Sequence, residues 1–147
     1  MAVSETDLQA LVGHRFPGGT YRIAHWENAL LTEATGGRPL PGDLAHPVHL
    51  FHVPIAGAGV TIAELFALAH ADSDASVTID YYDWEVSKPL RESTTYLMRG
   101  GITEHSRKCI EAGPVVDSVT FRIEVMDESA DEVARVTFRW NFWRFAS

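Results

Sequence analysis

The sequence is poor in cysteine and in basic residues. Cys109 is the only cysteine among 147 residues, which excludes an intrachain disulfide and a zinc site built from cysteines, and fits a reducing compartment. Twelve lysines and arginines stand against 20 aspartates and glutamates, and they are scattered along the chain, so that the net charge is -8. Because binding to nucleic-acid phosphates needs a concentrated basic patch, we expect no nucleic-acid partner.

A long uninterrupted apolar run is also missing. The longest apolar stretch, residues 55–71, contains Glu64 and is too short to span a bilayer. The first seven residues include Glu5 and Asp7, where a signal peptide would carry basic residues. These features predict a cytoplasmic protein that does not bind a membrane. With 46% hydrophobic and 22% charged residues, residues 1–147 are expected to form a single globular domain with a buried core.

The second half of the sequence predicts an antiparallel sheet. β-Branched and aromatic residues alternate with polar ones in four successive segments. These segments are residues 77–86, 94–103, 119–125 and 135–142. Strands that follow one another through short turns pair in antiparallel fashion, and a slip of the alternation at Tyr81 and Tyr82 indicates a bulge. Residues 20–23 predict a further strand. Residues 36–54, with four prolines and three glycines, are predicted to be mostly irregular, with at most one helical turn near residues 46–49.

Residues 61–70 form the most clearly predicted helix. Thr61 and Glu64 are spaced as a capping box, in which each side chain satisfies a backbone amide of the other residue. Apolar residues recur at helical spacing and Glu64 is the only charge, so we expect burial over most of the circumference. An antiparallel sheet wrapped around this central helix is the α+β hot-dog fold. A cone-shaped barrel of the cystatin-like kind is the alternative on pattern alone.

Residues 42–52 hold three of the seven histidines and one aspartate, just ahead of a glycine-rich segment. A histidine beside a carboxylate exchanges protons near neutral pH, and free amides at the start of a helix stabilise a developing negative charge. We therefore predict an acid–base site for a thioester-type substrate; close packing of the glycines against a strand is the alternative. The residues predicted to hold the thioester carbonyl oxygen are Gly57, Ala58 and Gly59.

His49 is the strongest candidate for the acid–base group, and a hydrogen bond to the loop backbone is its alternative role. His46, one helical turn earlier, is predicted to bind the substrate or to cap the chain, and His52, between two apolar residues, to be buried. The spacing of these histidines splays the outer two around one helix, and Pro47 interrupts the turn. We therefore expect no metal site.

Several short motifs resemble those of one protein family. Residues 88–96 (KPLRESTTY), 99–103 (RGGIT) and 107–108 (RK) are similar to a run that joins the second and third strands in MaoC-like, fatty-acid-synthase-type dehydratases. Residues 46–49 (HPVH), ahead of residues 56–60 (AGAGV), resemble the entry to that family's central helix. The resemblance implies a hot-dog fold and a hydratase or dehydratase, which adds water to an acyl thioester or removes it.

The resemblance also implies roles for individual residues. The family's acyl group is carried on coenzyme A or on the phosphopantetheine of acyl carrier protein, so the carrier is part of the substrate and no separate cofactor is implied. The family's catalytic aspartate and histidine correspond to Asp43 and His49, with one extra residue between them here. On this basis His49 moves a proton or activates water, Asp43 orients it, and Gly59 with its neighbours polarises the carbonyl. Three strand arginines are candidates for contacts with carrier phosphates, with a solvated face as the alternative: Arg122, Arg139 and Arg144.

Two other functions remain open from the sequence. One is a non-catalytic, acyl-binding subunit that completes an active site on another hot-dog subunit. The other is a hot-dog acyl-CoA thioesterase that uses Glu64 or Asp43. Apolar residues on both faces of the last strand, at residues 140–145, indicate that a partner covers its outer face. We therefore expect a homodimer, or a heterodimer with a second hot-dog subunit.

Overall fold

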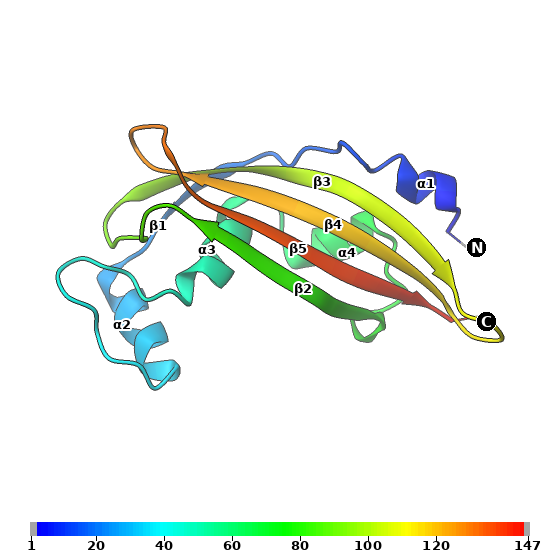
Figure 1. Ribbon diagram of the computed structural model, residues 1–147, viewed down its shortest axis with the longest axis horizontal. Coiled ribbons are helices and arrows are strands. Elements are labelled where there is room, and N and C mark those ends of the chain that lie inside the picture. The colour runs from blue at the N-terminus through cyan, green and yellow to red at the C-terminus, as the bar shows by residue number, and fades with distance from the viewer. Residues whose placement is uncertain (1–2, 146–147) are drawn as a thin grey trace.

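Five antiparallel strands form one curved sheet in the order β1-β3-β4-β5-β2 within residues 3–145, the part of the chain that the computed structural model describes (Figure 1). The strands are β1 (Gly19–Arg22), β2 (Val77–Val86), β3 (Thr95–Cys109), β4 (Val115–Met126) and β5 (Glu132–Arg144). The helices are α1 (Glu5–Gln9), α2 (His25–Ala34), α3 (His49–Gly57) and α4 (Ile62–Leu68). The predicted α+β class and its antiparallel sheet are confirmed.

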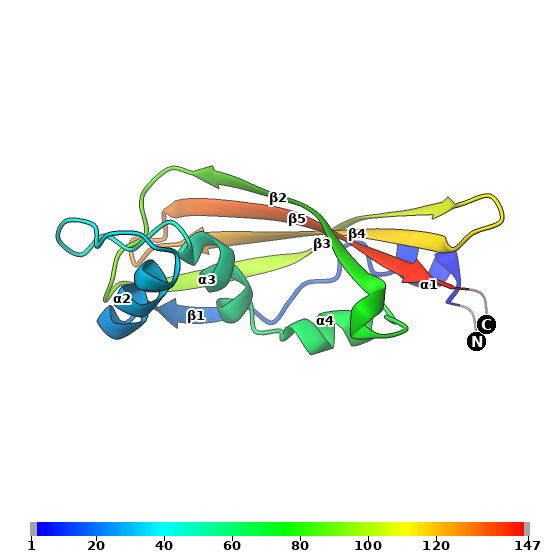
Figure 2. The same cartoon turned by 90° about the horizontal axis from the view of Figure 1, so that it is seen from below.

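One face of the sheet is apolar and is covered by helices. Along β4, Phe121, Ile123 and Val125 are buried and alternate with more exposed residues, as expected for a strand with one face on the core. Helices α3 and α4 both lie on the concave side of the sheet (Figures 1 and 2). Aromatic side chains fill this core, where the rings of Phe121 and Phe138 stack with 5.0 Å between their centroids. The sheet therefore curves around helices, as the hot-dog prediction requires.

The strands extend beyond their predicted ranges. β3 continues past Thr103 to Cys109, and β4 begins at Val115 rather than at residue 119. Backbone pairing persists there although the side-chain alternation is poor, so the pattern alone underestimates strand length. The register between β2 and β5 shifts between Ile79 and Tyr81, which places the predicted bulge slightly earlier in the strand.

Helix α3 is the main departure from the prediction, which left residues 36–54 mostly irregular. Pro54 lies inside this helix and has no N–H to donate to the carbonyl of Leu50, four residues earlier. That carbonyl instead accepts a hydrogen bond from the indole Nε1 of Trp84, at 3.1 Å. An edge strand thus supplies the donor that the proline lacks, and the helix continues to Gly57.

Helix α4 begins with the predicted capping box. Thr61 Oγ1 accepts a hydrogen bond from the Glu64 amide at 3.1 Å, and Glu64 Oε2 accepts one from the Thr61 amide at 2.7 Å. The helix ends at Leu68 and buries Leu65 fully, whereas Ile62 is 48% exposed. The expected burial over most of its circumference is therefore wrong for a single chain, because α3 and α4 share the concave face and α4 presents one side to it.

No single helix within residues 3–145 is long and apolar enough to cross a membrane. Helices α3 and α4 taken together, with a bend of 64° between them, have the length and composition of a broken span.

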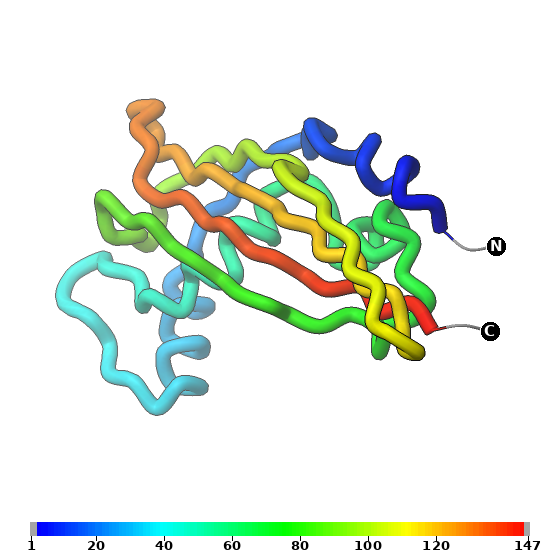
Figure 3. Tube along the Cα trace, turned by 45° about the vertical axis from the view of Figure 1, so that its right-hand side comes forward, coloured from blue at the N-terminus to red at the C-terminus, as the bar shows by residue number. Residues whose placement is uncertain are grey.

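Helix α2 and the connection that follows it project beyond the edge of the sheet (Figure 3). Trp26 and Leu30 on its outer side are 70% and 58% exposed. Its buried residues are the polar Asn28 and Thr32. The inner face of α2 is therefore polar, whereas the inner face of a helix in a globular protein is usually apolar.

Candidate functional site

His49 lies in the first turn of α3 and is fully buried. Neither Nδ1 nor Nε2 of its ring has a hydrogen-bond partner within residues 3–145. Burial lowers the pKa of His49 below its ordinary value, and the nearby Glu27 carboxylate opposes this only in part. A buried polar group without a partner costs about 1–3 kcal/mol, so this imidazole is a poor choice for stability alone.

A hydrogen-bonded group of three side chains, the Tyr21–Glu27–His52 group, lies close enough to His49 for Glu27 and His52 to affect its pKa. The Tyr21 hydroxyl donates to Glu27 Oε1 and lies 3.0 Å from Nε2 of His52. The same His52 nitrogen is 3.4 Å from Glu27 Oε1. Glu27 is 13% exposed and His52 is 49% exposed, so the group runs from a nearly buried carboxylate to solvent. The predicted burial of His52 is therefore wrong. Burial and the bond to Glu27 raise the pKa of Tyr21 to about 12, which keeps its proton in place at neutral pH.

Asn28 and Glu92 hold the segment that leads into α3. Asn28 Nδ2 donates to the carbonyl of Leu44 at 3.2 Å and to Glu92 Oε1 at 2.6 Å, and Asn28 Oδ1 accepts from the amide of His46 at 2.9 Å. Glu92 also pairs with Nδ1 of His25 at 2.9 Å. Hydrogen bonds from Asn28 and His25 lower the pKa of Glu92, so it stays ionised. This network explains the polar inner face of α2 and positions the first turn of α3.

Asp43 lies outside this network. Its carboxylate pairs with the guanidinium of Arg91 at the surface, where the two side chains are 56% and 49% exposed. Its backbone carbonyl accepts a hydrogen bond from the amide of Glu92 at 2.7 Å. No hydrogen bond or ion pair joins Asp43 to His49 in the described part of the chain. The two residues of the predicted pair are therefore not connected.

His46 makes a capping contact just before α3. Its Nδ1 accepts a hydrogen bond from the amide of Val48 at 3.1 Å. On its other side, Nε2 would lie 3.1 Å from a Cβ at Gly37, so the ring packs closely against that glycine. Among the described residues, no group of three or more histidine, cysteine or acidic side chains is placed to hold a metal ion.

Gly57, Ala58 and Gly59 pack against the start of β1. The Ala58 carbonyl accepts a hydrogen bond from the amide of Gly18 at 2.9 Å, and a Cβ at Gly59 would lie 2.4 Å from the Gly18 carbonyl oxygen. A Cβ at Gly57 would overlap the side chain of Met98. Close packing therefore accounts for both glycines. The amide of Gly59, a residue exposed at the surface, has no hydrogen-bond acceptor within residues 3–145.

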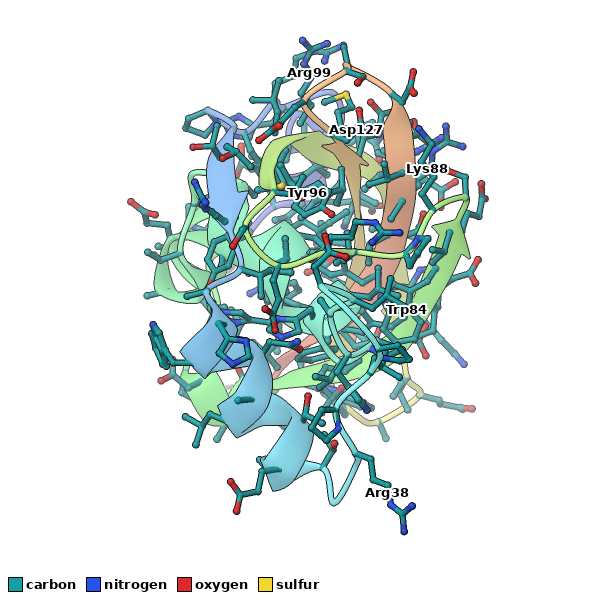
Figure 4. All side chains as sticks on the ribbon, turned by 90° about the vertical axis from the view of Figure 1, so that its left-hand side faces the viewer. Arg38, Trp84, Lys88, Tyr96, Arg99 and Asp127 are labelled. Atoms are coloured by element: carbon teal, nitrogen blue, oxygen red, sulfur yellow. The ribbon has the colours of Figure 1, made fainter. Side chains whose placement is uncertain are left out.

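An apolar groove of about 320 Å³ opens beside the first turn of α3. Its walls include Pro47 and Leu50 on one side and Val86 at the end of β2 on the other, and Lys88 is its only charged lining residue. Trp84 and Lys88 lie along the same edge of the molecule (Figure 4). The groove is mostly apolar, as ligand pockets commonly are, and no histidine or carboxylate is among its lining residues.

The three candidate arginines differ in their surroundings. Arg139 pairs with Glu104 at 3.3 Å, and Arg144 pairs with Asp117 at 2.6 Å. Arg122 has no ion pair within residues 3–145, and it alternates with buried residues of β4, so it lies on the face of the sheet opposite α3. Arg122 therefore lies across the sheet from His46, His49 and His52, and within residues 3–145 it is the one candidate of the three that forms no ion pair with a carboxylate.

Tyr21, Glu27 and Asn28, which lie on β1 and α2, were not predicted as site residues. Nothing in their local sequence indicates that they meet α3, because the contacts depend on how α2 folds back beside the sheet. One signal was available. Trp26 and Leu30 share a face of α2, so Asn28 and Thr32 necessarily share another, and a buried polar face often marks a functional network.

No protein-family model matches the sequence, and no curated protein matches it. Solved structures do match the fold. A chain of the ChsH1–ChsH2 complex from Mycobacterium tuberculosis has a TM-score of 0.71 and 14% identity, covering 97% of this chain and 92% of that one. A chain of the HadBC (3R)-hydroxyacyl-ACP dehydratase complex from the same organism gives 0.60 at 11% identity, with coverage of 86% and 92%. A hypothetical thioesterase from Streptococcus pneumoniae, solved with coenzyme A, gives 0.56 at 11% identity, with coverage of 97% and 95%.

These similarities agree with the order of the strands and with the helices on the concave face. The protein has the hot-dog fold. The fold implied by the sequence motifs is thereby confirmed.

Proposed function

We propose that this protein is a hydratase or dehydratase that acts on acyl thioesters. The observation that carries the proposal is the buried imidazole of His49 with two unpartnered nitrogens. A water molecule or a substrate hydroxyl is the partner that would complete its hydrogen bonds. The similarity in fold to a hydroxyacyl-ACP dehydratase and to a coenzyme A-bound protein supports thioester chemistry. The acyl group is carried on coenzyme A or phosphopantetheine, and its chain occupies the groove beside α3.

In the hydration direction His49 takes a proton from water, the hydroxyl adds to the β-carbon, and a proton is delivered to the α-carbon. The thioester oxygen becomes negative in the transition state and requires a hydrogen-bond donor. Gly59 does not serve together with His49, because it lies beyond the other end of α3, about 12–15 Å along the helix. Glu27 replaces Asp43 as the carboxylate beside the histidines, since Asp43 is paired at the surface. His52, which is partly exposed, passes protons between this group and solvent.

Replacing His49 by glutamine is expected to lower kcat for hydration of crotonyl-CoA by about 10²–10⁴-fold, the usual contribution of a general acid–base group. The loss of enoyl absorbance measures the rate. Glu27→Gln is expected to slow the reaction more than Asp43→Asn. Asp43→Asn is the matched control, because it also replaces one carboxylate by an amide, but at the surface. Absence of hydration by the wild-type chain, alone and with its partner, would contradict the proposal. A rate lost in Asp43→Asn but kept in Glu27→Gln would return the role to Asp43.

A non-catalytic subunit of a two-protein dehydratase is the second candidate. Two observations favour it: His49 is fully buried, and the carboxylate of Asp43 pairs with Arg91 at the surface instead of with a histidine. Similarity in fold to chains of the ChsH1–ChsH2 and HadBC complexes is in keeping with it. This candidate predicts that the chain co-purifies with a catalytic hot-dog protein and that His49→Gln leaves the activity of the complex unchanged.

A thioesterase has less support. Glu64, a carboxylate considered for that role, is exposed, and its hydrogen bonds with Thr61 in the helix cap lower its pKa. Release of free thiol from acyl-CoA would nevertheless identify this activity directly.

The open edge of β2 is the surface that we propose for pairing with a second hot-dog subunit, either another copy or a different chain. β2 lies at one end of the sheet, and Ile79, Trp84 and Val86 on it are 59%, 40% and 48% exposed. Phe51 of α3, 47% exposed, continues this apolar surface by contacting Tyr82, with 4.7 Å between ring centroids. Long, exposed apolar edge strands pair with other chains unless something covers them.

Ile79→Glu is expected to weaken this association by about 2–3 kcal/mol, roughly 30- to 150-fold in the dissociation constant, because it buries an unpaired charge. Sedimentation equilibrium measures the change. Leu30→Glu is the matched control, since it adds the same charge to an exposed apolar residue of α2, away from the β2 edge. A wild-type chain that stays monomeric without a partner protein present, and that captures no second hot-dog subunit, contradicts the prediction. So does an equal effect of the two variants.

A further inference from the structure

A hollow of about 430 Å³ lies on the convex face of the sheet, beside β3, β4 and the segment that precedes β1. Three arginines, Arg15, Arg99 and Arg122, contribute to its lining, and Glu124 is the only acidic residue there. We propose that this hollow binds the phosphate group of a small-molecule ligand.

Backbone pairing places the arginines around one opening. Arg15 pairs with Gly101 of β3, and Gly101 pairs in turn with Arg122 of β4. The backbone of His14 and Arg15 packs closely on Gly101, where a Cβ would lie 2.3 Å from the His14 carbonyl oxygen. Arg15 and Arg122 lie on either side of Gly101, with their Cα atoms about 10 Å apart, or two strand spacings. Arg99 lies two residues along β3 and therefore projects from the same face as Gly101. The opening is thus bordered by guanidinium groups from three adjacent segments.

The positive charge of this hollow exceeds its negative charge: Glu124 lies opposite Arg99 in the register of β3 and β4, and it is the one acidic residue among three arginines in the lining. Arg15, Arg99 and Arg122 form no ion pair within residues 3–145, whereas five other arginines of the chain do. Arg122 Nε is also buried without an acceptor. Like charges on neighbouring strands repel, and a buried donor without an acceptor is costly. A phosphate group relieves both conditions, because its oxygens accept from several guanidinium groups at once and its charge offsets theirs.

The hollow is separate from the proposed acyl site. Arg122 lies between Phe121 and Ile123, whose side chains are buried on the concave side with α3 and α4. The sheet therefore stands between the arginines and His49. The chain has a net charge of -8, yet three arginines and only one acidic residue line this hollow. The phosphate site can consequently be tested whether or not the protein hydrates thioesters.

Calorimetric titration of the full chain with inorganic pyrophosphate, and separately with ADP, tests the proposal at one fixed ionic strength. We expect saturable binding that weakens about tenfold in each of Arg15→Gln and Arg99→Gln, since each loses a charge-assisted hydrogen bond. Both residues are exposed, so their variants are expected to melt at the wild-type temperature. Arg38→Gln is the matched control. It removes the same charge at the far end of the molecule from Arg99 and is expected to bind as wild type does (Figure 4).

The two ligands distinguish the source of the phosphate. Tighter binding of ADP than of pyrophosphate supports a nucleotide ligand, and equal binding supports recognition of the phosphate groups alone. Chemical-shift changes on addition of pyrophosphate are expected at the amides of Gly100 and Gly101. The proposal is overturned if neither ligand binds saturably, if Arg38→Gln weakens binding as much as Arg15→Gln, or if the shift changes occur away from this hollow.

Discussion

Replacing Asp117 by asparagine is expected to lower the free energy of unfolding by about 3–5 kcal/mol. Asp117 is fully buried on β4, and its carboxylate binds three side chains from the strands on either side. Oδ1 accepts from His105 at 3.0 Å and from Arg107 Nε at 2.7 Å, and Oδ2 accepts from Arg144 Nε at 2.6 Å. Asparagine keeps the shape of the side chain but leaves two largely buried guanidinium groups without a counter-charge.

The same cluster predicts how stability responds to acid. Burial alone would raise the pKa of Asp117, but hydrogen bonds from Arg107, Arg144 and His105 outweigh it and lower the pKa from 3.8 to about 2. The folded pKa lies below the unfolded one, so the contribution is complete above about pH 4 and is lost as the pH falls to about 2. It amounts to about 2 kcal/mol. Asp117→Asn should therefore lose less stability between pH 5 and pH 2 than wild type does.

Urea denaturation at neutral and acid pH measures both effects. Asp83→Asn is the control, because Asp83 is exposed on β2 and has no ion pair in the described part of the chain. It is expected to stay within about 0.5 kcal/mol of wild type. A loss of less than about 1 kcal/mol in Asp117→Asn would show that the cluster does not hold the strands together.

Gly59→Ala is expected to cost about 2–5 kcal/mol of unfolding free energy. Gly59 has a φ of +76°, a conformation that costs an L-residue about 1–2 kcal/mol. The new Cβ would also lie 2.4 Å from the carbonyl oxygen of Gly18, and relieving such overpacking adds about 1–3 kcal/mol. Because backbone meets backbone here, the contact cannot relax by rotating a side chain.

Gly36→Ala separates the two contributions. Gly36 has a similar φ of +71°, but a Cβ there would have no atom within 4 Å. We expect it to cost about 1–2 kcal/mol, the conformational part alone. Denaturant unfolding of both variants measures the difference. Equal losses would mean that the approach of Gly59 to β1 is not tight, and the packing explanation of this glycine would then fail.

Elements with a local signal were predictable. The cap at Thr61 and Glu64 and the alternation along β4 and β5 are properties of neighbouring residues, and they located α4 and the sheet. Helix α3 was not predictable in this way, because Pro54 normally argues against a helix and its missing donor is replaced by Trp84, 34 residues away from the acceptor Leu50.

In the candidate site too, residues with a local sequence signal were predictable, and contacts that depend on tertiary structure were not. His49 stood out by residue type and by its place ahead of the glycines. In the structure it is a buried imidazole with no hydrogen-bond partner within residues 3–145, and its acid–base role stays a prediction. Which carboxylate lies near His49 depends on tertiary structure and could not be predicted from the sequence. Asp43 is near in sequence but faces Arg91, whereas Glu27 is distant in sequence and close in space. The Asp117 cluster was invisible for a similar reason, since it depends on the register of three strands.

The strand order has a consequence for synthesis of the chain. Within residues 3–145, β2 pairs with β5 alone, from Val77 opposite Phe142 to Val86 opposite Ala134, yet β5 is the last of the five strands to leave the ribosome. At bacterial and eukaryotic elongation rates of about 5–20 residues per second, β2 waits roughly 2–13 s for its partner. Throughout this interval the nascent chain displays an unpaired apolar strand, and it is then, before folding is complete, that it most needs a chaperone.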